Sequence, residues 1–328
     1  MKMTSVPGVS MSASVSAKSA LAAAVAVLAF MATSEAGAAT SIAQSRSAAE
    51  AFTAAVPNST PTAVTLYSNG FDTYANNANL TAAAGGSWTR DGSGAAVATT
   101  AAGLAQTGAG AALLTPSSTT AGSWLYRSGT AIANPAASAN PIVTSSAALR
   151  ITAPASGTAN RSVVLGLQTY DSAVDMLGSA SVIWDGANTY GFGTSHLILQ
   201  FGFGDGTQDF GYDFGAVTSA QLSSVGYFDV SVSLNYKTGD IAFGWGNTAL
   251  GQAFAIEDTH GSFDPSAMSD FSDADLYYAR GSTGGTLPRL LADNYSITTS
   301  AVPEPGTWAL MLSGFGVLGM LARRRKPE

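Results

Sequence analysis

Clustered aspartates are the side chains of this sequence whose type and spacing best suit metal chemistry. Asp205, Asp209 and Asp213 recur at four-residue intervals among glycines, and a second group lies between residues 264 and 275. Ca²⁺ in proteins takes carboxylate and loop carbonyl oxygens as ligands. An interval of four keeps side chains on one face of a strand, where they either gather around an ion or face water. Neither group has EF-hand spacing, and Asp205, Asp209 and Asp213 stand as candidate Ca²⁺ ligands.

The spacing of the titratable residues does not match a known catalytic motif. Glycoside hydrolysis needs two carboxyl groups flanking the bond, but the Glu-x-Asp-x-x-Glu strand of sandwich-fold hydrolases is absent. A serine–histidine–acid triad has His196 or His260 as its base. Ser195 and His196 are neighbours, so they point to opposite faces of a strand. We therefore expect no catalytic residues and no enzyme; an unrecognised pair of aspartates is the alternative that would make a hydrolase.

Aromatic side chains supply the remaining candidate chemistry. Trp88, Trp124, Trp184 and Trp245 are candidates either for stacking on sugar rings or for packing in a core. Large aromatic residues dominate burial energy, and Trp245 continues an alternating apolar face, so we assign it to the core. Trp88 follows a glycine and a serine and is the candidate for an exposed glycan-binding residue.

Short strands must position these side chains. Residues 227–236 alternate between apolar and polar side chains, which is typical of a strand with one buried face. The turn at residues 237–240, with Gly239, and the renewed alternation over 241–245 predict a β-hairpin. Further strands are expected at residues 63–68, 123–127, 147–152, 162–169, 179–184, 195–203, 275–279 and 295–299. The pattern predicts an all-β sandwich or jelly roll. For residues 81–122 three alternatives remain: a long loop, a glycan-bearing segment or weak strands.

The N-terminus has the organisation of a secretory signal peptide. Lys2 and Lys18 precede an apolar run over residues 20–32, and a small-residue cleavage pattern follows at residues 36–39. A helix over this run would cover about 20 Å, which is short for a bilayer. We therefore expect cleavage after Ala38 and export through the secretion translocon.

The C-terminus combines a proline-rich motif, an apolar segment and a basic tail. Pro303, Glu304 and Pro305 are followed by residues 306–322, which carry no charge and have Trp308 near their start. That length is the lower limit for a membrane helix. Four basic residues come next: Arg323, Arg324, Arg325 and Lys326. Basic residues favour the cytoplasmic side and tryptophan favours the interface, so we expect these residues to anchor and orient a single transmembrane helix.

These C-terminal features together resemble the PEP-CTERM sorting signal of exported bacterial proteins. The resemblance implies that Pro303, Glu304 and Pro305 are recognised by exosortase, an integral membrane processing enzyme. It also implies a Gram-negative envelope in which exopolysaccharide is made. The body resembles, more loosely, concanavalin-type and laminin-G-like sandwiches, on the evidence of the hairpin turn at 235–240 and the closing segment 293–298.

Composition narrows the remaining function classes. The net charge of −7 argues against a nucleic acid partner, which needs a basic surface. The absence of cysteine excludes a disulfide framework and a thiolate zinc site. We expect no cofactor apart from the candidate Ca²⁺.

The sequence therefore predicts an exported, non-enzymatic surface or matrix protein. We expect a precursor anchored in the inner membrane, sorting by exosortase, and association with exopolysaccharide or biofilm through glycan contacts. The alternatives are an extracellular polysaccharide hydrolase and an unprocessed single-span envelope adhesin. The expected division is a signal peptide at 1–38, a linker at 39–61, a β-sandwich at 62–300 and the sorting signal at 301–328.

Overall fold

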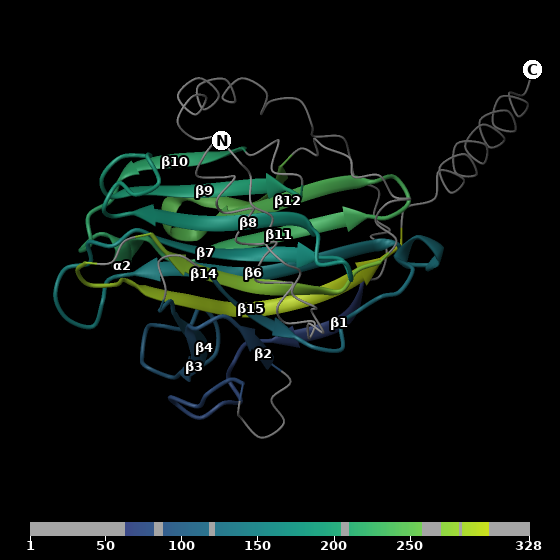
Figure 1. Ribbon diagram of the computed structural model, residues 1–328, viewed down its shortest axis with the longest axis horizontal. Coiled ribbons are helices and arrows are strands. Elements are labelled where there is room, and N and C mark those ends of the chain that lie inside the picture. Colours follow the sequence, from purple (N-terminus) through teal and green to yellow (C-terminus); the bar gives the residue numbers. More distant parts are fainter. Residues whose placement is uncertain are drawn as a thin grey trace, which may run out of the picture.

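The computed structural model describes residues 63–81, 88–117, 122–204, 210–257, 270–281 and 284–301. These residues form two antiparallel β-sheets that enclose a shared hydrophobic core (Figure 1). The predicted all-β sandwich is confirmed.

The first sheet has eight strands in the order β13-β12-β11-β6-β15-β4-β3, with β1 also paired to β15. Their bounds are β1 Val64–Asn69, β3 Ala95–Thr99, β4 Ala111–Thr115, β6 Ile142–Thr152, β11 Phe228–Asn235, β12 Asp240–Asn247, β13 Gln252–Glu257 and β15 Arg289–Ser300.

The second sheet has seven strands in the order β10-β9-β8-β7-β14-β5-β2. Their bounds are β2 Trp88–Asp91, β5 Ser123–Arg127, β7 Val163–Tyr170, β8 Met176–Asp185, β9 His196–Phe203, β10 Phe210–Ala216 and β14 Asp273–Arg280. Helical structure in the described residues is limited to one turn of α-helix, α2 Leu222–Val225, and two 3₁₀ turns, η2 Pro135–Ala137 and η3 Thr248–Leu250.

The predicted hairpin is confirmed in type and register. Strands β11 and β12 pair from Asn235 opposite Asp240 to Asp229 opposite Gly246. Gly239 in the turn has a φ of 77°, a conformation that glycine adopts without steric cost. All eight other predicted strands are present, and four of them (β6, β8, β14 and β15) are longer than expected. Within residues 81–122 the weak-strand alternative is correct, because β2, β3 and β4 lie there.

Strand β15 has different partners along its two edges, and this arrangement builds one end of the sandwich. One edge pairs with β6 along almost the whole strand. The other edge pairs with β4 at residues 290–292 and with β1 at residues 295–299. The register shifts between Asp293 and Ser296, where Asn294 has a φ of 48°. The bulge therefore separates β4 from β1 and aims the end of β1 toward the loops beside it.

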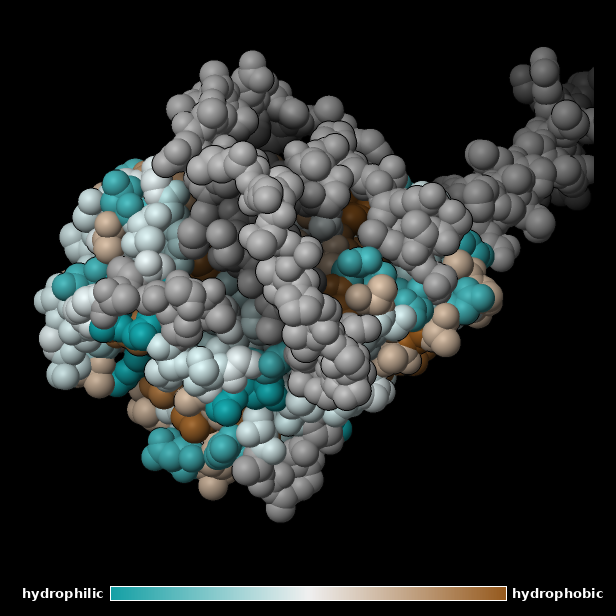
Figure 2. Space-filling view, viewed as in Figure 1, coloured by the Kyte–Doolittle hydropathy of each residue, from teal (hydrophilic) through white to brown (hydrophobic). Residues whose placement is uncertain are grey.

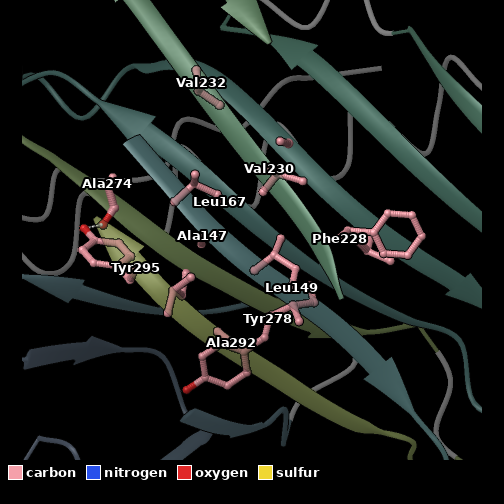
Figure 3. Close-up of a cluster of buried hydrophobic side chains, with 14 of the residues drawn as sticks. Ala147, Leu149, Leu167, Phe228, Val230, Val232, Ala274, Tyr278, Ala292 and Tyr295 are labelled. Carbon is pink, nitrogen blue, oxygen red and sulfur yellow. Dashed lines mark hydrogen bonds between the residues drawn. The ribbon is translucent and has the colours of Figure 1, made fainter. Parts of the chain in front are cut away.

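The core lies between the sheets and contains side chains from both. Figure 3 shows buried side chains of both sheets in this core, among them Leu149, Phe228 and Val230 of the first sheet and Leu167 of the second. The hydroxyl of Tyr295 on β15 donates to the carbonyl of Ala274 on β14 at 2.7 Å, drawn as a dashed line in that view. This hydrogen bond satisfies a phenol that has no access to water and joins the two sheets through the core.

The described surface in the view of Figure 2 is mainly hydrophilic or neutral, with small and separate hydrophobic patches. Within the described ranges, no helix is both long and apolar enough to cross a membrane. The predicted signal peptide, linker and C-terminal helix lie outside those ranges, as do Asp205, Asp209 and His260.

Candidate functional site

A polar pocket of about 400 Å³ lies where the C-terminal end of β1 meets the C-terminal end of β5. It is therefore built from both sheets. Its lining residues are Tyr67, Ser68, Asn69, Gly70, Asp72, Thr73, Tyr74 and Arg127.

A tight turn after β1 shapes the pocket. The side-chain oxygen of Asn69 accepts the N–H of Phe71 at 2.6 Å, which is the hydrogen bond of an Asx turn. Phe71 has a φ of 60° and is fully buried, with its ring stacked 5.4 Å from that of Trp88. Burial of this ring offsets the cost of the left-handed conformation. The chain consequently reverses and brings Tyr74 back beside Asn69.

The two phenol groups of the pocket are oriented as donors. Because the oxygen of Asn69 is engaged by Phe71, its amide nitrogen faces the phenols; it donates to Tyr67 Oη at 2.8 Å and to Tyr74 Oη at 3.3 Å. Each phenol oxygen thus accepts from Asn69 and retains its own hydrogen for a ligand. Burial raises the pKa of Tyr67, so this phenol remains protonated at neutral pH.

Arg127 supplies the positive charge of the pocket. Its guanidinium carbon lies 4.7 Å from the centre of the Tyr67 ring, in a cation–π arrangement. No carboxylate of the described residues lies within 4.0 Å of this guanidinium. Asp72 also lines the pocket, but its Oδ1 already accepts the N–H groups of Ala109 and Gly110 at 2.6 and 2.7 Å.

Trp88 does not have the exposed position expected for it. Its side chain is 3% exposed, because its ring packs between Phe71, Tyr67 and Tyr295 at centroid distances of 5.1 to 5.9 Å. The expectation of an exposed stacking residue is therefore wrong. Trp88 instead lies behind Tyr67 and holds that ring in place from the core side.

The remaining tryptophans of the described sheets are also packing residues. Trp124, Trp184 and Trp245 are 2%, 0% and 5% exposed. The assignment of Trp245 to the core is confirmed, with the ring of Tyr212 at 4.9 Å. Trp184 satisfies its indole N–H by donating to the carbonyl of Val217 at 2.9 Å. Exposed tryptophan stacking therefore has no candidate in this part of the chain.

Of the three candidate Ca²⁺ ligands, Asp213 alone falls within the described residues. Its carboxylate contacts Nδ1 of His196 at 2.9 Å across the β9–β10 pair. In the part of the chain that the structure describes, no three acidic or histidine side chains gather closely enough to hold a metal ion. The proposed Ca²⁺ set of Asp205, Asp209 and Asp213 stays a prediction.

A second constellation contains two aspartates of the C-terminal acidic group. Asp273 and Asp275 lie two residues apart on β14 and share the face of the second sheet that points away from the core. Burial raises the pKa of Asp275 well above its usual range, and the charge of Asp273 raises it further. Burial also raises the pKa of Asp273, to about 6. Because both pKa values are raised, we expect the pair to keep a proton at a pH at which exposed aspartates are ionised.

Aromatic and amide groups enclose this carboxyl pair. Asp275 lies opposite Tyr126 on β5 and opposite Gln168 on β7. The side-chain oxygen of Gln168 accepts from Trp124 Nε1 at 3.1 Å and from Tyr170 Oη at 2.7 Å. Asp275 is 6% exposed in the full chain, so its proton is held in an environment of low polarity.

The pocket residues carried little signal in the sequence. Tyr67 and Arg127 are sixty positions apart, and nothing in their spacing associates them. The usable signal was the scarcity of charge: an arginine at the end of a predicted strand is informative in a chain with 11% charged residues. The acidic group containing Asp273 and Asp275 was visible, but the pairing of these two was not.

Comparisons with known proteins locate one family match and a set of similar folds. The PEP-CTERM protein-sorting motif matches residues 301–326. No curated protein matches the chain. Similar solved structures include lectin II from Ulex europaeus, with 12% identity over 72% of this chain and 100% of the lectin, at a TM-score of 0.41.

Two further structures extend this set. Arcelin-5, a lectin-like defence protein from Phaseolus vulgaris, has 10% identity over 74% of this chain and all of its own, at a TM-score of 0.39. The CBM2 module of the evolved Dit protein of Lactobacillus casei BL23 phage J-1 has 11% identity over 74% of this chain and 99% of its own, at a TM-score of 0.45. A two-sheet sandwich is followed directly by a PEP-CTERM sorting motif, which implies an exported protein sorted by exosortase.

Proposed function

We propose that this protein is a non-enzymatic component of the cell envelope or extracellular matrix that contacts exopolysaccharide through its β-sandwich. The observation that carries the proposal is the sorting motif at residues 301–326, which begins immediately after β15 ends at Ser300. The described residues before this motif form the sandwich, so we place the extracellular role on its surface.

The polar pocket supports glycan contact. Sugars are recognised by directional hydrogen bonds to their oxygens, combined with an aromatic surface. The hydroxyls of Tyr67 and Tyr74 and the guanidinium of Arg127 point donors into one volume. The pocket lies within the range of about 300 to 1,000 Å³ typical of small-ligand sites.

Sorting is tested on protein isolated from its native host. Mass spectrometry of the mature C-terminus is expected to show loss of the residues beyond about Pro305. A Glu304→Gln variant tests recognition of the motif and is expected to accumulate as the full-length form, with Glu328 retained. An intact tail ending at Glu328 in the wild type would contradict exosortase sorting and favour the unprocessed single-span adhesin.

Glycan contact is tested with exopolysaccharide purified from the same host. Affinity electrophoresis of the wild type is expected to show retardation, and a Tyr67→Phe/Tyr74→Phe double variant should lose most of it because two donors are removed. Tyr126→Phe is the matched control, since Tyr126 lies on the other side of the second sheet and does not line the pocket. Equal retardation of all three proteins would contradict recognition at this pocket.

The carboxyl pair gives a specific reason to keep hydrolysis as a second candidate function. Asp273 and Asp275 are neighbouring carboxyl groups with raised pKa values, and a carboxyl group that stays protonated is one of the two that acid-assisted glycoside cleavage requires. Release of reducing ends from the host polysaccharide, abolished in Asp275→Asn, would establish this activity. We expect no release from the wild type.

A further inference from the structure

Arg127 combines a place in the pocket with a guanidinium that has no hydrogen-bond partner among the described residues. Arg150, Arg161 and Arg280 each donate to a backbone carbonyl. Within the described residues, the guanidinium of Arg127 makes neither a hydrogen bond nor an ion pair, and its recorded contact is the face of the Tyr67 ring. Its forked N–H groups therefore remain available at the pocket.

The position of Arg127 is fixed before any ligand arrives. Its guanidinium rests on the Tyr67 ring, and that ring is wedged edge-on against Trp88 and Tyr295, each at 5.9 Å. Trp88 and Tyr295 are 3% and 0% exposed, so the support belongs to the rigid core. A cation held in this way loses little conformational freedom on binding.

Three donor groups of the pocket can meet one ligand group. Arg127 offers a planar fork, and Tyr67 and Tyr74 each offer an O–H group, because their oxygens already accept from Asn69. Acceptors are also present: two backbone N–H groups occupy Oδ1 of Asp72, and its Oδ2 can accept from a sugar hydroxyl. A neutral sugar needs acceptors as well as donors, whereas a carboxylate only accepts. The geometry matches bidentate binding of a carboxylate by arginine.

We propose that the pocket selects an acidic saccharide, with the carboxylate of a uronate residue bound by Arg127 and flanked by the hydroxyls of Tyr67 and Tyr74. The proposal rests on the proposed glycan contact and specifies its chemical class. A carboxylate could also come from a small organic acid, so the test contains an arm for that source.

The test compares two ligands that differ in one group, which is a carboxylate in the first and its uncharged methyl ester in the second. An oligogalacturonate and its fully methyl-esterified form are titrated calorimetrically into the full chain in detergent micelles at about 150 mM salt, which screens the negative charge of the protein. The wild type is expected to bind the acid at least about 10-fold more tightly than the ester, since hydrogen bonds to a charged group are the stronger ones. Acetate is expected to compete weakly or not at all.

Variants assign the preference to Arg127. Arg127→Gln is expected to lose about 10- to 100-fold in affinity for the acid and little for the ester. Arg90→Gln is the matched control, because Arg90 is exposed on the neighbouring strand β2 and does not line the pocket. Tyr74→Phe, which leaves the guanidinium and its aromatic support unchanged, is expected to weaken acid binding by a smaller factor. It also serves if Arg127→Gln fails to fold.

Each outcome has a distinct meaning. Equal affinity of the wild type for acid and ester, or an unchanged acid preference in Arg127→Gln, would overturn the proposal while leaving glycan contact intact. Full competition by acetate would show that the pocket takes any carboxylate and would overturn the saccharide class. Absence of binding to acid, ester and host polysaccharide alike would overturn the proposed glycan contact together with this inference.

Discussion

Replacing Asp275 by asparagine tests whether the carboxyl pair of β14 shares one proton. In the wild type the pKa of Asp273 is about 6, against an ordinary value of 3.8, because the group is buried. A carboxyl group whose pKa is higher in the folded protein than in the unfolded chain makes its full contribution to stability at pH values below the unfolded pKa. That stabilisation is lost as the pH rises through the folded pKa. The stability of the wild type should therefore fall between about pH 4 and pH 7.

The size of this effect follows from the shift in pKa. One pKa unit corresponds to about 1.4 kcal/mol. A shift from 3.8 to about 6 therefore lowers the free energy of unfolding by about 3 kcal/mol between pH 4 and pH 7. In Asp275→Asn, the new amide donates to Asp273 without needing a proton. Burial of Asp273 remains in the variant, so we expect it to keep this fall of about 3 kcal/mol and to lose the additional pH dependence that the raised pKa of Asp275 gives the wild type. The variant should therefore be more stable than the wild type at pH 7.5.

The assay is urea unfolding at pH 4, 6 and 7.5, followed by tryptophan fluorescence. Trp88, Trp124, Trp184 and Trp245 are all buried and report on the sandwich. Asp175→Asn is the control, because Asp175 is an exposed aspartate of the β7–β8 turn, and this variant should keep the pH dependence of the wild type. The same pH dependence in Asp275→Asn as in the wild type would refute the raised pKa of Asp275 and with it the shared proton.

Two further substitutions test the loops that join the strands. Asp185 is fully buried, and its carboxylate accepts hydrogen bonds from the hydroxyl of Ser162 and from three backbone N–H groups of the β8–β9 loop. Because these bonds depend on the carboxylate, Asp185→Asn should lower the free energy of unfolding by about 3 kcal/mol. An unchanged urea midpoint would contradict this anchoring role. Gly239→Ala places a Cβ at a φ of 77° and should cost about 1 kcal/mol in thermal unfolding, whereas a neutral result would mean that the turn relaxes to another conformation.

The sandwich was predictable wherever alternation and turn chemistry agreed. Residues 227–247 alternate with period two around a glycine-containing turn, and the structure has the hairpin in the register that this pattern requires. The strands that escaped prediction lack that agreement. Strands β3 and β4 are rich in alanine, which has a low preference for strands, and they are stabilised by pairing with each other and with β15. In β10, glycines separate the aromatic residues and imitate a loop.

The pocket was beyond sequence reasoning for a different reason. Its donors come from β1, from the turn after β1 and from β5, which belong to different sheets. Sequence context also misplaced Trp88, since glycine and serine before a tryptophan suggest an exposed turn. In the fold, Trp88 is the first residue of β2. Its side chain points into the core and packs on Tyr295, more than two hundred residues away in the sequence. Local composition describes the neighbours along the chain, whereas exposure is decided by neighbours across the core.

The pairing of β1 with β15 sets the distance between the sorting motif and the proposed binding pocket. Val64 lies opposite Thr299, at the end of β15 from which the sorting motif departs, and Asn69 lies opposite Tyr295. Five residues of strand therefore separate the start of the tether from the pocket, a distance of about 17 Å. A protein held at residue 301 consequently has its pocket at the far end of β1, away from the point of attachment. The proposed glycan contact at Arg127 therefore does not lie at the residue where the sorting motif begins.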